Sequence, residues 1–125
     1  MHDIRQAIQQ ACPAWAKQAD DEYHRWRRED EAAANFSPGI WLEYLAGCVN
    51  RHLQQSTDAT VLWPLFLQIA RQLPAVEARN PGMIDNCFTE YLFYGLSAEQ
   101  ARPGWKMLPS ALRKQYLDFH HKPPC

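Results

Sequence analysis

The chain has 125 residues, of which 46% are hydrophobic and 22% charged, a composition typical of one globular domain rather than of a disordered segment. Its 13 basic and 14 acidic residues leave a formal net charge of −1, so the electrostatic attraction on which nucleic-acid binding depends is missing. No apolar run approaches the roughly 20 residues that span a bilayer, and the first ten residues lack the layout of a secretory signal. These features predict a single cytoplasmic domain over residues 1–125 that binds neither nucleic acid nor membrane.

Two helices are expected in the first third of the chain. Apolar residues recur at helical spacing over residues 4–12, with Asp3 as the N-cap, and Pro13 interrupts this helix and can begin the next. The second helix is expected to extend to about Ala33. Its core-facing positions are Trp15, Ala19, Tyr23 and Trp26.

Two longer apolar stripes follow. Ser37 and Pro38 provide an N-cap and a first-turn proline, and the helix that they begin has its apolar stripe at Trp41, Tyr44, Leu45, Cys48, Val49, His52 and Leu53. After a polar turn at residues 54–58, a second stripe consists of Leu62, Leu65, Phe66, Ile69, Ala70 and Leu73. Pro74 is expected to end this second helix because proline lacks the amide donor.

Three further elements are expected before the C-terminus. Asn80 and Pro81 restart a helix whose stripe is Ile84, Cys87, Phe88, Tyr91 and Leu92, and Gly95 suits the left-handed position just past a helix end. Ser97 caps a short turn that is expected to stop before Pro103. The last helix is expected over residues 109–120, with Leu112, Tyr116 and Phe119 inward.

The resulting prediction is an all-α fold of five or six helices, packed as antiparallel helical hairpins because the connections are short. The sequence also contains one internal echo, because residues 41–45 (WLEYL) and residues 88–92 (FTEYL) share an EYL core. The echo is explained either by chance or by a duplicated helix pair.

Most enzymatic chemistries lack their residues here. The four cysteines at positions 12, 48, 87 and 125 form no closely spaced pair for zinc, and Cys48 and Cys87 fall on apolar stripes where a thiolate is disfavoured. The sequence contains no GxSxG motif and no clustered glycines for a phosphate loop. We therefore expect no catalytic residue, no bound metal and no cofactor, and a protein that is not an enzyme.

Aromatic residues make up 12% of the chain, and several lie off the predicted core stripes. Aromatic anchors surrounded by polar groups are typical of protein-binding surfaces, and the apolar candidates for such anchors are Trp63, Leu67, Phe93 and Trp105. The rival interpretation is that a small protein uses these side chains in its own core.

Two acids, Glu43 and Glu90, occupy equivalent positions in the echoed pieces. If the helices pack side by side, both carboxylates would face one cleft and would bind a polar ligand or a divalent ion, with His52 nearby. This gives the alternative hypothesis of a ligand- or metal-binding helical bundle, with or without enzymatic activity. Ordinary surface acids, or hydrogen bonds from one helix to another, explain the same residues without a ligand.

Four pieces between residues 41 and 113 form a recognisable pattern: Tyr44-Leu45-x-x-Cys48-Val49, the run from Leu65-Phe66 to Leu73, the run from Asn86 to Leu92 with its Phe88-x-Glu90-x-Leu92 core, and the segment from Met107 to Arg113. With this pattern, residues 41–113 resemble a family of uncharacterised small helical bacterial proteins that includes candidate immunity proteins of polymorphic toxin systems. The resemblance implies a protein partner, a cognate toxin domain, and no catalytic residues. We therefore expect an immunity protein, a monomer or weak homodimer, that neutralises a toxin by direct binding, with the charged residues 17–31 steering the encounter.

Overall fold

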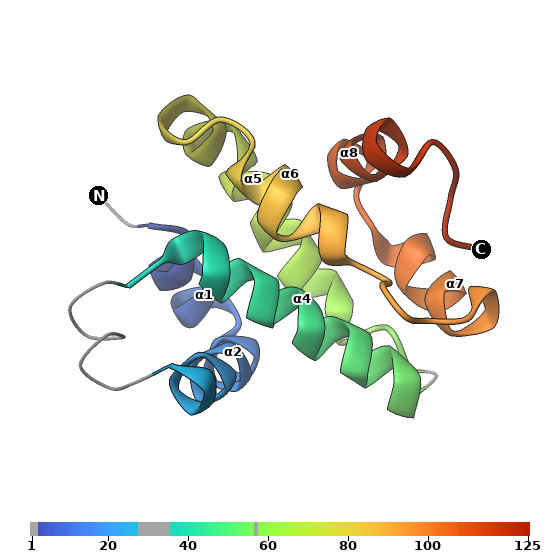
Figure 1. Ribbon diagram of the computed structural model, residues 1–125, viewed down its shortest axis with the longest axis horizontal. Coiled ribbons are helices and arrows are strands. Elements are labelled where there is room, and N and C mark those ends of the chain that lie inside the picture. The colour runs from blue at the N-terminus through green and yellow to red at the C-terminus, as the bar shows by residue number, and fades with distance from the viewer. Residues whose placement is uncertain (1–2, 28–35, 57) are drawn as a thin grey trace.

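The computed structural model describes residues 3–27, 36–56 and 58–125. These residues form seven α-helices and one short 3-10 helix, with no β-strand among them, so the all-α prediction is confirmed and the predicted number of helices is too low. The elements in chain order are α1 (Ile4–Ala11), α2 (Pro13–Trp26), α4 (Pro38–Gln55), α5 (Leu62–Arg79), α6 (Met83–Cys87), the 3-10 helix η1 (Thr89–Tyr91), α7 (Ala98–Met107) and α8 (Ser110–His120). In Figure 1, α4 and α5 span the middle of the molecule, with α1 and α2 at one end and α7 and α8 at the other.

The predicted start of both N-terminal helices is confirmed. Asp3 accepts a hydrogen bond from the Gln6 amide at 2.8 Å and donates its own amide to the Gln6 side chain at 3.2 Å, and α2 begins at Pro13. The predicted extension of α2 is wrong, because Arg27 has extended backbone and the helix ends at Trp26. Residues 28–35, which the prediction included, lie outside the described residues. Trp26 was expected to face the core but is 67% exposed.

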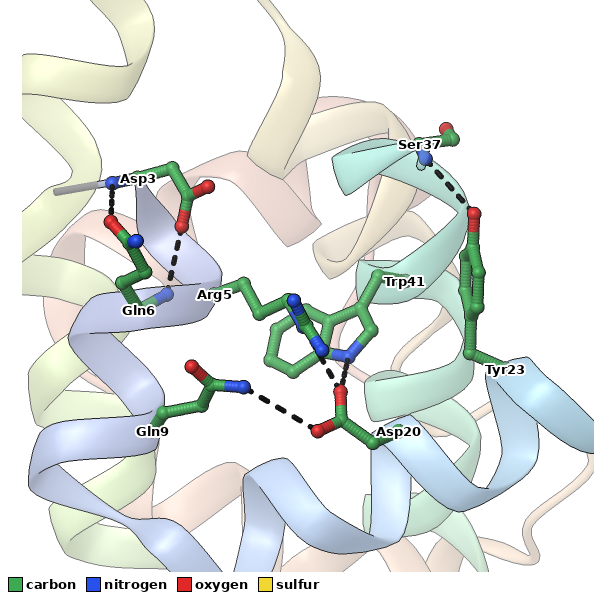
Figure 2. A network of polar contacts seen from close by, with 8 residues as sticks. All are labelled: Asp3, Arg5, Gln6, Gln9, Asp20, Tyr23, Ser37 and Trp41. Atoms are coloured by element: carbon green, nitrogen blue, oxygen red, sulfur yellow. Dashed lines mark hydrogen bonds and ion pairs between the residues drawn. The ribbon is translucent and has the colours of Figure 1, made fainter. Parts of the chain in front are cut away.

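A polar network centred on Asp20 joins α1, α2 and α4 (Figure 2). The Trp41 indole donates to Asp20 Oδ1 at 2.8 Å, Arg5 Nε donates to the same oxygen at 3.0 Å, and Gln9 Nε2 lies 3.4 Å from Oδ2. Trp41 is fully buried, so its indole nitrogen depends on Asp20 for a partner. The network fixes the position of α4 relative to the N-terminal helices.

The predicted stripe on α4 is largely confirmed. Ser37 caps the helix by accepting from the Ile40 amide at 3.1 Å, and its own amide donates to Tyr23 Oη at 3.0 Å (Figure 2). The buried members of the stripe are Trp41, Leu45, Cys48, Val49 and Leu53, whereas Tyr44 and His52 are partly exposed.

Two predicted helix ends are wrong for the same reason. α5 continues through Pro74 to Arg79, and α7 continues through Pro103 to Met107. An interior proline removes one backbone hydrogen bond. In both helices a buried residue lies beyond the proline, Val76 in α5 and Gly104 in α7, so packing of the following turn favours continuation of the helix. The second extension turns the predicted short turn into a full helix and accounts for the underestimated number of helices.

The predicted helix over residues 84–92 is broken. α6 ends at Cys87, η1 follows, and Phe93 and Gly95 both have positive φ, at 67° and 77°. The buried Thr89 hydroxyl donates to Gln115 of α8 at 2.9 Å, which ties η1 to α8. Because residues 41–45 lie within α4 and residues 88–92 include a 3-10 helix, the two echoed pieces have different structures.

The remaining packing departs from a simple series of hairpins, because α1 contacts α5 and α4 contacts α7, pairs that are distant in the chain. In α8, Leu112 and Tyr116 are buried as predicted, but Phe119 is half-exposed. Within the described ranges, no helix combines the length and the apolar character needed to cross a membrane.

Candidate functional site

A strained turn after η1 has an unusual backbone. Phe93 has a φ of 67°, a conformation that costs a bulky residue roughly 1–3 kcal/mol. The side chain of Asn50, on α4, holds the turn at two points: the Phe93 amide donates to Asn50 Oδ1 at 2.7 Å, and Asn50 Nδ2 donates to the Tyr91 carbonyl at 2.9 Å. We call residues 91–95 the clamped turn.

The Phe93 ring occupies a slot in the core. A side chain on Gly104 would place a Cβ 2.8 Å from both Phe93 Cε1 and Leu53 Cδ1, so the slot requires a glycine. The ring also makes edge contacts with Trp105 and Tyr116, at centroid distances of 6.4 Å and 5.7 Å. Phe93 is 4% exposed and anchors the clamped turn from below.

The anchored Phe93 leaves the neighbouring aromatic side chains outside the core. Tyr91 is 41% exposed, and Tyr94, at 81%, is the most exposed large apolar side chain in the described part of the chain. A buried Phe93 in left-handed conformation thus presents a tyrosine to solvent on either side of it.

The outward face of α4 forms a shallow groove beside the clamped turn. Glu43, Gly47, Asn50 and Gln54 repeat at helical spacing along this face, and the depression that they line together with Glu22, Tyr44 and Arg51 has a volume of about 370 Å³. We call it the α4 groove. Gly47 lies exposed within it, in the middle of an 18-residue helix.

The charges around the α4 groove differ in their pairing. Arg51 forms an ion pair with Glu22 at 3.1 Å; slight burial would raise the pKa of Glu22, but hydrogen bonds from Trp26 and Arg51 outweigh it and lower that pKa. Glu43 and Glu90 form no ion pair with any described residue.

The structure brings Glu43 and Glu90 to the same two neighbours. The charge of Glu43, and to a smaller extent that of Glu90, raises the pKa of Tyr91. Burial raises the pKa of the Cys87 thiol, and both carboxylates raise it further. The charges of both acids therefore act on the same two side chains, Cys87 and Tyr91, and the shared cleft stays a prediction.

Among the residues that the structure describes, the cysteines near this arrangement do not have the lowered pKa of an activated thiol. A thiol whose pKa is raised is mostly protonated at neutral pH. Burial raises the pKa of the Cys48 thiol as well. His52, the third member of the alternative hypothesis, contacts the Trp15 ring and lies 2.7 Å from the Asp58 carbonyl oxygen. Among the described residues, no group of three or more His, Cys, Asp or Glu side chains could hold a metal ion.

The four apolar candidates from the sequence do not form one exposed surface. Phe93 and Trp105 pack against each other and Tyr116, and the Arg113 guanidinium covers the Trp105 ring at 5.3 Å. The expectation that Phe93 lies off the core is wrong, because its positive φ turns the ring inward. Trp63 is 46% exposed at the start of α5, and Leu67, one turn later, is partly buried.

Sequence reasoning missed Asn50, Gly47, Tyr91 and Tyr94 as members of the site. The helical spacing of Tyr91 from Ile84 and Cys87 predicts that it faces the core. In the structure α6 ends at Cys87 and a 3-10 helix follows, so Tyr91 lies at the surface. The signal that was present is a glycine in mid-helix at position 47, together with the aromatic pair Phe93 and Tyr94 directly before Gly95.

The fold and the site define a small all-helical protein in a single compact domain, with an aromatic turn held outward beside a charged groove. Compared with protein-family models, with curated proteins and with solved structures, the chain has no match in any of the three. The resemblance of residues 41–113 to small helical bacterial proteins therefore stays a prediction.

Proposed function

We propose that this chain is a protein-binding domain that acts as a cytoplasmic immunity protein of a bacterial toxin system. The observation that carries the proposal is the clamped turn, which holds Tyr91 and Tyr94 outward beside the α4 groove. Tyrosine is among the residues most enriched at the energetic centres of protein interfaces, because it buries a large rigid ring and keeps a polar hydroxyl.

The energetics of the turn support the same interpretation. Left-handed backbone at a phenylalanine persists only where surrounding contacts over-determine it, and such strain is found preferentially at functional sites. Here Asn50 and the slot at Gly104 supply those contacts. The Tyr94 ring is 81% exposed and packs little against the described residues. Its outward position would contribute binding energy when another molecule covers it.

Neutralisation would then be steric. A partner that docks on the clamped turn would have its active site covered or distorted by the bound domain, and the domain itself would need no catalytic residue. Glu22 belongs to the charged helix α2 and also lines the α4 groove. The charges of α2 would therefore influence the rate at which the partner is encountered more than the final affinity.

The test is binding between the purified chain and the product of the gene adjacent to its own. We expect a complex at micromolar concentration or below, and rescue of growth when both proteins are expressed together. The double variant Tyr91→Ala, Tyr94→Ala should weaken binding by at least about 30-fold, the loss expected for two aromatic anchors.

Trp63→Ala is the matched control, because Trp63 is an aromatic residue of similar exposure on another helix. It should bind as the unmodified chain does. If only the Trp63 variant loses affinity, the interface lies on α5 rather than at the clamped turn. The absence of any complex at micromolar concentration would contradict the proposed function.

A further inference from the structure

Resting on this proposed function, we propose that the α4 groove receives a basic segment of the protein partner. In this arrangement the partner backbone passes close over Gly47, and an arginine or lysine side chain places its cation between Glu43 and Glu90, against the ring of Tyr91. The inference concerns the chemistry of the partner, which the proposed function leaves open.

The first observation is that Gly47 has no role within the described chain. A Cβ at Gly104 would lie 2.8 Å from its neighbours and a Cβ at Gly39 would lie 3.0 Å from Cys87 Sγ, while Gly82 and Gly95 have positive φ. Each of these four glycines therefore satisfies a packing or backbone requirement. A Cβ at Gly47 meets no atom within 4 Å.

An interior glycine makes a helix less stable than alanine would, so its presence at an exposed position calls for a reason outside the helix. Glycine is the residue used where another backbone approaches closely. Because Gly47 lies in the α4 groove, one turn from Glu43, the approaching chain would run along the groove next to Glu43.

The second observation is the charge beside the groove. Arg51 is engaged by Glu22 at 3.1 Å, whereas Glu43 and Glu90 have no ion-pair partner among the described residues. The hydroxyl of the half-exposed Tyr91 hydrogen-bonds to Glu43, Glu90 precedes Tyr91 in η1, and a tyrosine face attracts a cation. A cation from the partner would interact favourably with all three groups at once.

The same charges disfavour other occupants. A phosphate backbone or an acidic segment would be repelled by Glu43 and Glu90, and a purely apolar segment would remove water from two carboxylates without supplying a counter-charge. These occupants remain as distinguishable outcomes of the experiment.

The experiment begins with a displayed library of random 12-residue peptides, selected against the full chain. We expect the recovered peptides to be enriched in arginine or lysine, and amide resonances of Gly47, Glu43 and Tyr91 to shift when the tightest peptide is added. The double variant Glu43→Gln, Glu90→Gln should weaken that peptide about tenfold, the product of two modest charge interactions.

The matched control is the double variant Asp118→Asn, Glu99→Gln, which also removes two negative charges but lies on α8 and α7, outside the residues that line the groove. It should change the dissociation constant less than twofold. Gly47→Phe should fill the groove and weaken the peptide strongly, and Gly47→Ala should weaken it less, because one methyl group takes only part of the space of the approaching backbone. Should Gly47→Phe fail to fold, judged by circular dichroism, the charge variants decide the matter alone.

Several outcomes would overturn the inference: no recovered peptide, peptides without enriched basic residues, or equal weakening by the two charge double variants. If the recovered peptides lack basic residues but Gly47→Phe blocks their binding, the proposal of a basic segment is wrong and the proposed protein-binding function still stands. A partner complex insensitive to the Tyr91 and Tyr94 changes would remove the surface itself.

Discussion

Asp20 and Asn50 each connect distant parts of the chain with one polar side chain, but they stabilise opposite kinds of region. Asp20 accepts from three side chains, including that of the fully buried Trp41, and all three donors belong to helices packed together in the fold (Figure 2). Asn50 bonds only to backbone, at Tyr91 and Phe93, and thereby holds two tyrosine rings in solvent.

The two networks differ in whether polar and apolar groups around them remain without a partner in the described fold. Around Asp20, the hydrogen bonds and the buried surface favour the same packed arrangement of α1, α2 and α4. Around Asn50, the hydrogen bonds oppose the local backbone preference of Phe93, and the region has exposed rings and two acids that form no ion pair with another described residue. A region that stabilises an unfavourable conformation and exposes apolar surface is a candidate for binding, whereas a satisfied region is scaffold.

The largest expected effect would break the scaffold. Asp20→Ala should lower the free energy of unfolding by about 3 kcal/mol, because the buried Trp41 indole loses its acceptor. Urea denaturation measures the loss. Asp21→Ala is the control, since Asp21 is exposed and its ion pair among the described residues is an exposed one with Lys17, and it should change stability by less than about 0.5 kcal/mol. Equal losses in both variants would show that the network is not the support described here.

The next effect tests the clamp. Asn50→Ala should lower the free energy of unfolding by about 1–2 kcal/mol, because two hydrogen bonds are lost while the strain at Phe93 is partly released. Amide hydrogen exchange should accelerate at residues 91–95 and stay unchanged in α1 and α2. Gln54→Ala, on the same face of α4, should have little effect on either measurement. An unchanged exchange rate at Phe93 in the Asn50 variant would argue against the clamp.

The sequence predicts the scaffold better than it predicts the site, and the reason is physical. Periodicity and caps located most helices correctly, as at Asp3, Pro13 and Ser37, because these signals act over one or two turns. The continuation of α5 past Pro74 depends on burial of Val76, which no local pattern reveals. Pro74 and Pro103 therefore lie inside helices that the sequence predicts to end before them.

The site escaped prediction because it arises from contacts between distant residues. Phe93 turns inward only because Asn50, 43 residues earlier, accepts its amide and because Gly104 leaves room for its ring. The cleft that the echoed sequences suggest for Glu43 and Glu90 stays a prediction. The two echoed pieces have different structures, so repetition does not explain why both charges act on Tyr91.

A smaller effect of opposite sign compares two helical glycines. Gly47→Ala should raise the free energy of unfolding by about 0.5–1 kcal/mol, because the new methyl group meets nothing and the helix gains propensity. Gly104→Ala should lower it by about 1–3 kcal/mol, because its Cβ would collide with Phe93 and Leu53. Thermal unfolding measures both. A destabilising Gly47→Ala would mean that the glycine serves the fold after all.

The smallest effect concerns the titration of Tyr91. Its pKa should lie above the ordinary value of about 10, because the nearby charges of Glu43 and Glu90 disfavour the tyrosinate. Glu43→Gln should lower this pKa, Glu90→Gln should lower it less, and Glu99→Gln should leave it unchanged. Carbon-13 NMR of labelled tyrosine rings follows the titration of each residue separately. If the Glu43 and Glu99 variants titrate alike, Glu43 is too far from Tyr91 to share a bound cation with it.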